Sequence, residues 1–395
     1  MFDVAIVGAG PAGAWAAHLL AARGARVAIF DASHPREKPC GGGVTGRALA
    51  LIASAVDVES LPFVRVERAT FRGRGGRTVD VPLPADASAL RVGSRTDFDG
   101  RLLERAVASG AAHVPQRVLD VERDGRGFRL HTAPGSHRAA FIVGADGANS
   151  LIRRRVSCPF RREQLSVATG FFAHGVTSRS IVLELVDEPP GYIWSFPRPD
   201  HLAIGICAQA STGVSTTALR ARTARWIDET RIAAGRMLTP YAWPIPSLDE
   251  ADIDSLEVSG PGWMLVGDAA GLVDPITREG IFFAIESAAF AADSLAGANP
   301  ERLYADRLHA GPLDELARAA RLKRGFFQPR FTRLLLDALE VSSGVRAVMA
   351  DLVAGAQGYR GLKWRLAKTM EVGLAWKVVQ SRAQGVLDVR KSRIA

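Results

Sequence analysis

Apolar residues occur in short runs near the start of the chain, and their spacing predicts alternating strands and a helix. Phe2 to Val7 are apolar except for Asp3 and are typical of a buried strand, and residues 14–23, rich in Ala and Leu, predict a helix. A second short run at Val27 to Phe30 predicts a neighbouring strand. Because a glycine turn at residues 8–13 joins the first strand to the helix, the order is strand, turn, helix, strand.

This glycine turn has the spacing of a dinucleotide-binding fingerprint. Gly8 permits a tight turn, Gly10 lets backbone amides approach a pyrophosphate, and Gly13 lets the helix pack closely on the sheet. Asp31, at the end of the second strand, can accept a hydrogen bond from a ribose hydroxyl. The helix N-terminus adds partial positive charge for the phosphates. The fingerprint by itself does not distinguish NAD from FAD.

The pattern changes further along the chain. From residue 166 to 209 strands follow one another without helices between them, whereas residues 301–395 are helical by pattern. Alternation places Tyr192, Trp194 and Phe196 on one face of an extended segment, although the prolines and glycine around it argue against an ordinary core strand. The other predicted elements are strands at 64–71, 77–81, 90–93, 112–129, 141–147, 181–186, 201–207, 243–246 and 263–266, helices at 47–56, 95–109, 148–156, 217–234 and 281–295, and breaks in the helical end near 311–312, 325–329 and 358–361.

Length and composition limit the class of protein. With 395 residues, 47% of them hydrophobic, the chain can bury a large core. It contains no run of 18 or more apolar residues, so we expect no transmembrane helix, and the first strand leaves no room for a signal peptide. Three widely spaced cysteines, Cys40, Cys158 and Cys207, argue against a disulfide framework or a metal site, and for a cytoplasmic protein.

The net charge of +9 lies entirely in the last part of the chain. Residues 301–395 hold 18 Lys and Arg against 9 Asp and Glu. A basic surface attracts nucleic acid or anionic lipid alike, but no nucleic-acid-binding module is recognisable and we expect no such partner. Apolar residues at every fourth position, with cations beside them, allow either peripheral contact with the inner membrane face or packing on the protein itself. That row comprises Leu362, Leu366, Met370, Leu374 and Val378.

Further glycine segments carry candidate chemistry. The run Cys40 to Gly46 cannot be regular structure and predicts a loop close to something flat or bulky. A turn at Gly144 to Gly147 follows an apolar strand, and Gly267 and Asp268 follow another. Gly280 and Ile281 open the predicted helix at 281–295.

The fingerprint, the Gly144 to Gly147 turn and the Gly267–Asp268 turn occur in an order that resembles the flavoproteins related to aromatic hydroxylases. The resemblance implies one FAD bound in an extended form across a discontinuous domain. It implies that Asp31 holds the adenosine ribose, that Asp268 binds the ribityl or pyrophosphate region, and that the amides at Gly280 and Ile281 face the flavin. The implied cofactor-binding residues are Gly8, Gly10, Ala12, Gly13, Asp31, Gly41, Gly42, Arg95, Asp146, Gly267, Asp268, Gly280 and Ile281.

Two segments narrow the resemblance to the geranylgeranyl reductase family. One is Lys38 to Gly43, and the other runs from Pro189 to Pro197 and matches the family pattern Pro-x-x-Tyr-x-Trp-x-Phe-Pro followed by Gly-x-Gly. The chain departs from the family at Cys207, where the last glycine of that pattern is expected, and at Arg278, where a glycine is commoner. Cys207 would narrow the substrate tunnel or change which prenyl chain fits, and Arg278 would alter the local loop.

The resemblance implies reduction of isolated carbon–carbon double bonds in a prenyl chain of a lipid, quinone or terpenoid precursor. Tyr192, Trp194 and Phe196 would form the substrate wall, and their π faces could stabilise developing positive charge. We predict Tyr192, Trp194 and Cys40 as catalytic, with Tyr192 and Cys40 both candidate proton donors. NAD(P)H and ferredoxin both remain candidate electron donors, and the oligomeric state is open. The alternatives are an FAD-dependent monooxygenase or halogenase on the same scaffold, or a flavin-bearing or prenyl-lipid carrier.

The predicted fold is therefore α/β, with a discontinuous Rossmann-like FAD-binding domain, a β-sheet substrate-binding domain and a helical C-terminal region. We assign residues 1–63, 93–165 and 255–300 to the FAD-binding domain. Residues 64–92 and 166–254 are assigned to the substrate-binding domain, and residues 301–395 to the basic, helical C-terminal region.

Overall fold

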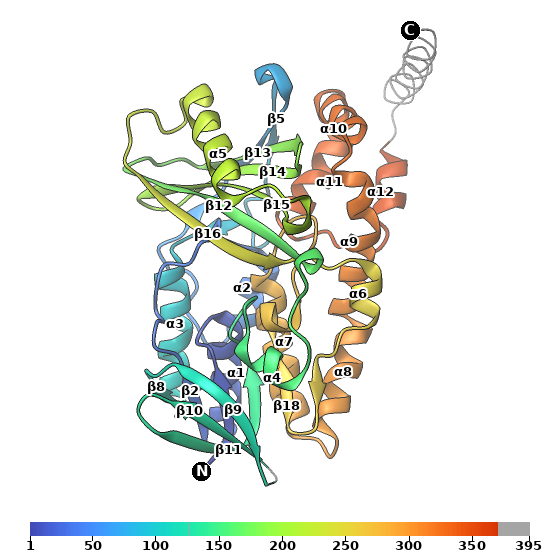
Figure 1. Cartoon of the computed structure of the whole chain (residues 1–395). Coiled ribbons are helices and arrows are strands. Elements are labelled where there is room, and N and C mark those ends of the chain that lie inside the picture. The colour runs from blue at the N-terminus through green and yellow to red at the C-terminus, as the bar shows by residue number, and fades with distance from the viewer. Residues whose placement is uncertain (126, 370–395) are drawn as a thin grey trace.

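A computed structural model of the chain describes residues 1–125 and 127–369. It consists of two layers of sheet, stacked end to end, with a column of C-terminal helices along one side (Figure 1). The N-terminal sheet has the order β17-β18-β11-β1-β2-β8, and its central pairs are parallel. Its strands are β1 (Phe2–Val7), β2 (Val27–Phe30), β8 (Ala112–Val114), β11 (Ser136–Gly144), β17 (Ser259–Gly260) and β18 (Trp263–Leu265), with β9 (Val118–Asp124) and β10 (Gly127–Thr132) added through β11.

Helix α1 (Pro11–Ala21) packs against both α3 (Arg95–Ala108) and α7 (Ile281–Ser294). All but one of its residues are buried, because its Ala- and Gly-rich sequence allows neighbouring helices and strands to approach closely. The strands and helices of this layer come from three separate parts of the chain. Its parallel strands, packed with helices, confirm the predicted α/β fold.

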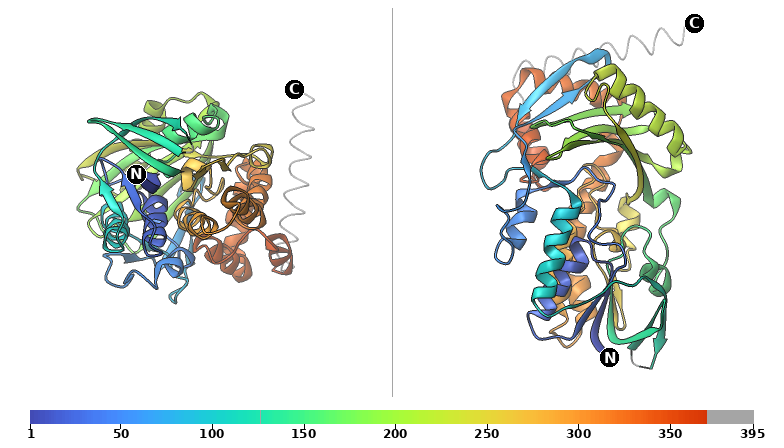
Figure 2. Two further views of the ribbon diagram at one scale, coloured as in Figure 1. Left: turned by 90° about the horizontal axis from the view of Figure 1, so that it is seen from below. Right: turned by 90° about the vertical axis from the view of Figure 1, so that its left-hand side faces the viewer.

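The second sheet is built from seven strands in the order β16-β12-β15-β14-β13-β5-β6. Helix α5 (Thr216–Thr230) packs on β12 and β15, and it lies on the outer side of this sheet (Figure 2). The strands are β5 (Arg68–Arg72), β6 (Thr78–Pro82), β12 (Leu165–His174), β13 (Ser180–Asp187), β14 (Pro190–Pro197), β15 (His201–Gln209) and β16 (Leu238–Pro246). A separate small sheet joins β3 (Gly43–Val44), β7 (Arg91–Val92) and β4 (Val64–Arg65).

The C-terminal helices follow the breaks that the sequence predicts, with one further break at Ser342 between α10 and α11. Helices α10 and α11 contact strand β6 of the second sheet. The helices of this part are α8 (Pro300–Ala310), α9 (Pro312–Phe326), α10 (Pro329–Val341), α11 (Ser343–Val353) and α12 (Leu362–Lys368); the remaining short ones are α2 (Gly46–Ile52), α4 (Leu151–Val156) and α6 (Glu250–Asp254), and four 3₁₀ turns at 74–76, 162–164, 210–212 and 267–270.

Within the described ranges, no helix has the length and hydrophobicity that a membrane span requires. In the predicted amphipathic row, Met370, Leu374 and Val378 lie outside the described residues. Membrane contact by the basic C-terminal region therefore stays a prediction, and so do the domain boundaries.

Four local expectations are corrected. The run at residues 40–46, predicted to be irregular, contains the short strand β3, which pairs with β7, and the first residue of α2. The helix predicted at 14–23 begins at Pro11, because proline at the first helical position costs no hydrogen bond. The strand predicted at 64–71 divides into β4 and β5, which belong to different sheets. The aromatic segment is a full strand, β14, at the centre of the second sheet. Pro190 and Pro197 lie at its two ends, so they do not interrupt the backbone hydrogen bonds of the residues between them.

Candidate active site

One cavity lies between the two layers and collects residues from both sheets and from the C-terminal helices. At one end it is lined by the N-terminus of α1 and the glycine loop that begins at Cys40. At the other end its lining is apolar and comes from β5, β13, β14, α9 and α11. The apolar residues there include Phe71, Ile181, Leu183, Leu185, Phe326, Met349, Leu352 and Val353.

The fingerprint glycines have the close packing that the sequence predicts. Gly8 has a φ of +103°, a conformation that favours glycine, and a Cβ at Gly13 would lie 1.9 Å from the carbonyl oxygen of Gly8. At Gly10, by contrast, a Cβ would meet only the Nε2 atom of His34, at 3.9 Å. Helix α1 also begins without a side-chain cap or an acidic residue in its first turn. An uncapped helix N-terminus beside open space at Gly10 suits a pyrophosphate, so these residues fit FAD.

The carboxylate of Asp31 is already engaged in local hydrogen bonds. Its Oδ2 accepts from the backbone N–H of Ala9 at 2.9 Å and lies 2.8 Å from Nδ1 of His34, and its Oδ1 accepts from the N–H of Ser33 at 2.7 Å. Burial alone would raise the pKa of Asp31, but the hydrogen bond and charge of His34 outweigh it and hold that pKa well below its usual value. Asp31 thus ties the fingerprint loop to the next loop, and its role with a ribose stays a prediction.

Arg95 lies at the start of α3 and lines the cavity. Its guanidinium donates to both oxygens of Asp99, at 2.8 and 2.7 Å, and both side chains are almost completely buried. This buried bidentate pair orients Arg95 beside the cavity. Asp99 lies one turn further along α3 and therefore holds the Arg95 side chain in place.

The glycine loop at residues 41–43 packs against a flat ring, as the sequence predicts. A Cβ at Gly41 or at Gly43 would lie 3.1 or 3.2 Å from ring atoms of Phe196. Gly42 has a φ of +82°, and a Cβ there would lie 2.4 Å from the carbonyl oxygen of Gly93. The loop is consequently held against strand β14, and all three glycines line the cavity.

Arg198, which sequence reasoning missed, holds this loop in place. Its side chain is completely buried, pairs with Glu37, and donates from Nη2 to the carbonyl oxygen of Cys40 at 2.6 Å. The only sequence signal is its position directly after Pro197, which does not reveal a partner more than 150 residues away.

Replacing Arg198 by Lys is expected to lower the free energy of unfolding by about 1–3 kcal/mol, because lysine keeps the charge next to Glu37 but cannot reproduce the planar set of donors. Urea denaturation would measure this loss. The matched control is Arg154→Lys on the exposed side of α4, which we expect to change stability by less than about 0.5 kcal/mol. Equal stability of the two variants would contradict the assigned role.

The remaining predicted cofactor residues lie on two turns. The carboxylate of Asp146 accepts from the backbone N–H groups of Leu151 and Ile152, at 2.6 and 3.2 Å, and so caps α4. Asp268 lies 3.6 Å from the Nζ atom of Lys38, and a Cβ at Gly280 would lie 3.2 Å from Oδ1 of Asp268.

Helix α7 begins beside the turn that carries Asp268. Its N-cap is Gly280, which provides no side-chain cap, and the first turn holds no acidic residue. Gly280 and Ile281 both line the cavity together with Pro11 of α1. Two helix N-termini therefore open onto one cavity, an arrangement that favours an extended anionic cofactor.

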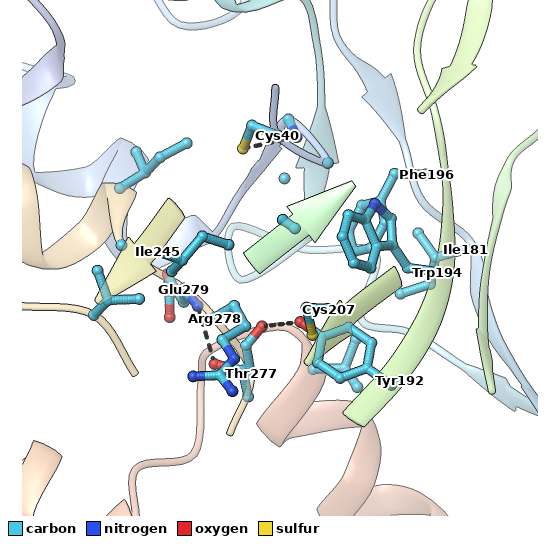
Figure 3. Close-up of a pocket in the computed structure, with 18 of the residues that line it drawn as sticks. Cys40, Ile181, Tyr192, Trp194, Phe196, Cys207, Ile245, Thr277, Arg278 and Glu279 are labelled. Carbon is cyan, nitrogen blue, oxygen red and sulfur yellow. Dashed lines mark hydrogen bonds between the residues drawn. The ribbon is translucent and has the colours of Figure 1, made fainter. Parts of the chain in front are cut away.

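Tyr192, Trp194 and Phe196 all line the cavity from strand β14 (Figure 3). The hydroxyl of Tyr192 donates to the carbonyl oxygen of Thr277 at 2.9 Å, and burial raises the pKa of Tyr192 well above its usual value. Cys207 pairs with Tyr192 across the sheet and is 1% exposed, so the departure from Gly-x-Gly places a thiol in the cavity wall.

The structure adds Glu279, a cavity-lining residue that the sequence reasoning left without a role. Its Oε1 accepts from the hydroxyl of Thr45 at 2.6 Å, and its Oε2 accepts from Nη2 of Arg47, also at 2.6 Å. Arg47 donates in addition to Glu315 at 3.1 Å. Burial raises the pKa of Glu279 despite the opposing effect of Arg47.

A third carboxyl group, that of Glu286 on α7, completes the Glu279 cluster, which we define as Glu279, Glu286, Glu315 and Arg47. Burial and the charges of Glu315 and Glu279 raise the pKa of Glu286 to about 7, although Arg47 opposes the rise. Arg47 donates to two of these carboxyl groups, so burial and mutual repulsion favour protonation within the cluster.

Comparisons with known proteins agree with this geometry. An FAD binding domain family matches residues 1–234. The menaquinone reductase of Mycolicibacterium smegmatis is 33% identical over 314 residues, which cover 74% of this chain and 75% of the relative. The geranylgeranyl diphosphate reductase of Rhodobacter capsulatus is 30% identical over 308 residues, 74% of each chain.

Among solved structures, a geranylgeranyl bacteriochlorophyll reductase-like protein from Thermoplasma acidophilum matches with a TM-score of 0.76. The match is 22% identical and covers 93% of this chain and 99% of that protein. At this level of identity, the likeness shows a shared fold across almost the whole length of both proteins.

Proposed function

We propose that this chain, which belongs to the geranylgeranyl reductase family of FAD-binding oxidoreductases, reduces isolated carbon–carbon double bonds in a prenyl chain. The observation that carries the proposal is a cavity that joins the N-termini of α1 and α7, where the residues fit FAD, to an apolar end built from the second sheet and the C-terminal helices. The names of the relatives, which include reductases of menaquinone and of geranylgeranyl diphosphate, support the same substrate class.

The apolar end suits a flexible hydrocarbon. Alternation on β13 places Ile181, Leu183 and Leu185 on the cavity face, and α11 supplies Met349 and Leu352 opposite. Such a wall binds a prenyl chain through burial of apolar surface and excludes water from the reacting double bond. Trp194 and Phe196 provide ring faces that stabilise developing positive charge.

Reduction of a double bond requires a hydride and a proton, and FAD, when bound in its reduced form, supplies the hydride. Several protonatable groups of this chain line the cavity, and they include Cys40, Tyr192, Cys207, Asp268 and Glu279. We propose Glu279 as the proton donor, because burial raises its pKa and so favours its protonated form. Tyr192 and Cys40 stay predicted catalytic residues, and their variants serve as comparisons.

An anaerobic assay tests the proposed function. The purified flavoprotein is reduced with dithionite and incubated separately with geranylgeranyl diphosphate, menaquinone and a geranylgeranylated glycerolipid, and the products are analysed by mass spectrometry. We expect a gain of two mass units, or a multiple of two, in at least one of them. If no substrate gains mass while addition of oxygen yields a hydroxylated or halogenated product, the monooxygenase or halogenase alternative replaces this proposal.

The same assay distinguishes the candidate electron donors. Replacing dithionite by NADPH, or by reduced ferredoxin, identifies the electron donor that supports turnover. We further propose a cytoplasmic location with peripheral contact at the inner membrane face, for which the basic C-terminal region and the lipid-like substrate are the support. Sedimentation with anionic vesicles would measure that contact.

A further inference from the structure

Arg278 stands out among the residues of the cavity wall. It has a φ of +63°, in a region that side-chain-bearing residues seldom adopt. It lies in a loop between Thr277 and Glu279, and the carbonyl oxygen of Thr277 accepts a hydrogen bond from the hydroxyl of Tyr192. The side chain of Arg278 lines the cavity (Figure 3). Because this backbone conformation costs free energy, Arg278 is a candidate for a functional role in the cavity.

A second cation lies directly behind Arg278. The Nζ atom of Lys323 donates to the hydroxyl oxygen of Ser247 at 2.7 Å and to Oε1 of Gln209 at 3.0 Å. Nη1 of Arg278 donates to the same Ser247 hydroxyl. The two positive groups therefore share one neutral acceptor, and Nε of Arg278 is buried without a hydrogen-bond partner.

No carboxylate of the described residues pairs directly with either cation. Over residues 1–125 and 127–369, neither Arg278 nor Lys323 forms an ion pair with an acidic side chain. The nearby acids are committed elsewhere, because Asp252 bonds to Arg161 and forms a capping box with Asp249. Burial and the charge of Arg278 lower the pKa of Lys323 to about 7, although Asp249 and Asp252 oppose the fall.

We propose that Arg278, supported by Lys323, forms a phosphate-binding subsite that holds the phosphate end of a prenyl substrate while its chain extends past Tyr192 into the apolar end. An anion bound there would compensate both cations and would take the free donors of a planar guanidinium. A diphosphate ester and a lipid phosphodiester share this chemistry. The assignment of a prenyl chain to the bound ligand rests on the proposed function, whereas the affinity of the subsite for an anion does not.

Calorimetric titration of the oxidised FAD-bound protein tests the subsite without turnover. The ligands are inorganic pyrophosphate, geranylgeranyl diphosphate, a geranylgeranylated glycerophosphate lipid, and geranylgeraniol as the phosphate-free control. For Arg278→Gly we expect affinity for the phosphate-bearing ligands to fall roughly tenfold or more, with affinity for geranylgeraniol unchanged. Lys323→Met should weaken the same ligands less, because Lys323 acts behind Arg278. The phosphate ligand that weakens most identifies the source of the anion.

Arg231→Gly is the matched control. Arg231 is exposed at the C-terminal end of α5 and has a φ of +56°, so the control removes the same charge and relieves the same kind of backbone strain away from the cavity. We expect Arg231→Gly to bind every ligand as the unaltered protein does.

Three results would overturn the subsite. They are unchanged affinity for all phosphate-bearing ligands in Arg278→Gly, equal weakening of geranylgeraniol, and equal weakening of these ligands in Arg231→Gly. Failure of the proposed function would look different: geranylgeranyl diphosphate would bind in an Arg278-dependent manner but gain no mass in the reduction assay.

Discussion

Gly13→Ala is expected to lower the free energy of unfolding by about 3 kcal/mol or more and to prevent FAD retention. The new Cβ would lie 1.9 Å from the carbonyl oxygen of Gly8 and 3.1 Å from Cβ of Ala145. The first contact is with backbone, so relief requires the helix and the strand to separate. Urea denaturation and the fraction of flavin that co-purifies would measure the two losses.

Gly10→Ala is the matched variant, and the opposite pattern is expected. Its Cβ would meet no protein atom closer than 3.9 Å, and its φ of −69° is accessible to alanine. Stability should therefore be unchanged or higher by up to about 1 kcal/mol, while FAD affinity, measured by flavin fluorescence, should fall roughly tenfold or more because the methyl group occupies pyrophosphate space. If Gly10→Ala retained FAD as well as the unaltered protein, the pyrophosphate would not lie at this turn.

Glu279→Gln is expected to reduce the rate of double-bond reduction by about a hundredfold or more, the usual contribution of a general acid. Glutamine can still accept from Arg47 and donate to Thr45, so stability and FAD binding should remain close to those of the unaltered protein. Tyr192→Phe and Cys40→Ser are the comparisons, and we expect each to cost less than about tenfold. Single-turnover oxidation of the reduced flavin by a prenyl substrate would give the rates.

The pH dependence follows from the same cluster. Burial raises the pKa of Glu279, so its proton is lost, and the rate should fall, as the pH rises through that raised pKa. The other groups that face Glu279 are Thr45, Arg47, Asp274, Glu315 and Tyr359. Glu286→Gln should shift this fall. A large loss in Tyr192→Phe with little change in Glu279→Gln would assign the proton to Tyr192, one of the two donors that the sequence leaves open.

Local sequence was sufficient for features that depend on near neighbours. The fingerprint turn, its helix and the first two strands were predicted because glycine conformation and apolar spacing act within a few residues. The breaks between the C-terminal helices were also predicted, from Gly311, Gly325 and Gly358, since glycine and proline end helices locally. The family resemblance then indicated the cofactor, and the match to an FAD binding domain family confirms it.

Tertiary structure alone decided which side chains meet in the cavity. Arg198 directly follows strand β14 but holds a loop at Cys40, and Arg47 meets Glu279 and Glu315 from three separate parts of the chain. The sequence marked Arg278 only as unusual, whereas the fold places it next to Lys323, and no acid of the described residues forms an ion pair with it. Charge pairing, burial and shared hydrogen bonds arise from contacts between residues far apart in the chain, and no local pattern encodes those distances. The sequence therefore determined the elements and the cofactor class, and the packing of the two layers determined the proton source and the anion subsite that we propose.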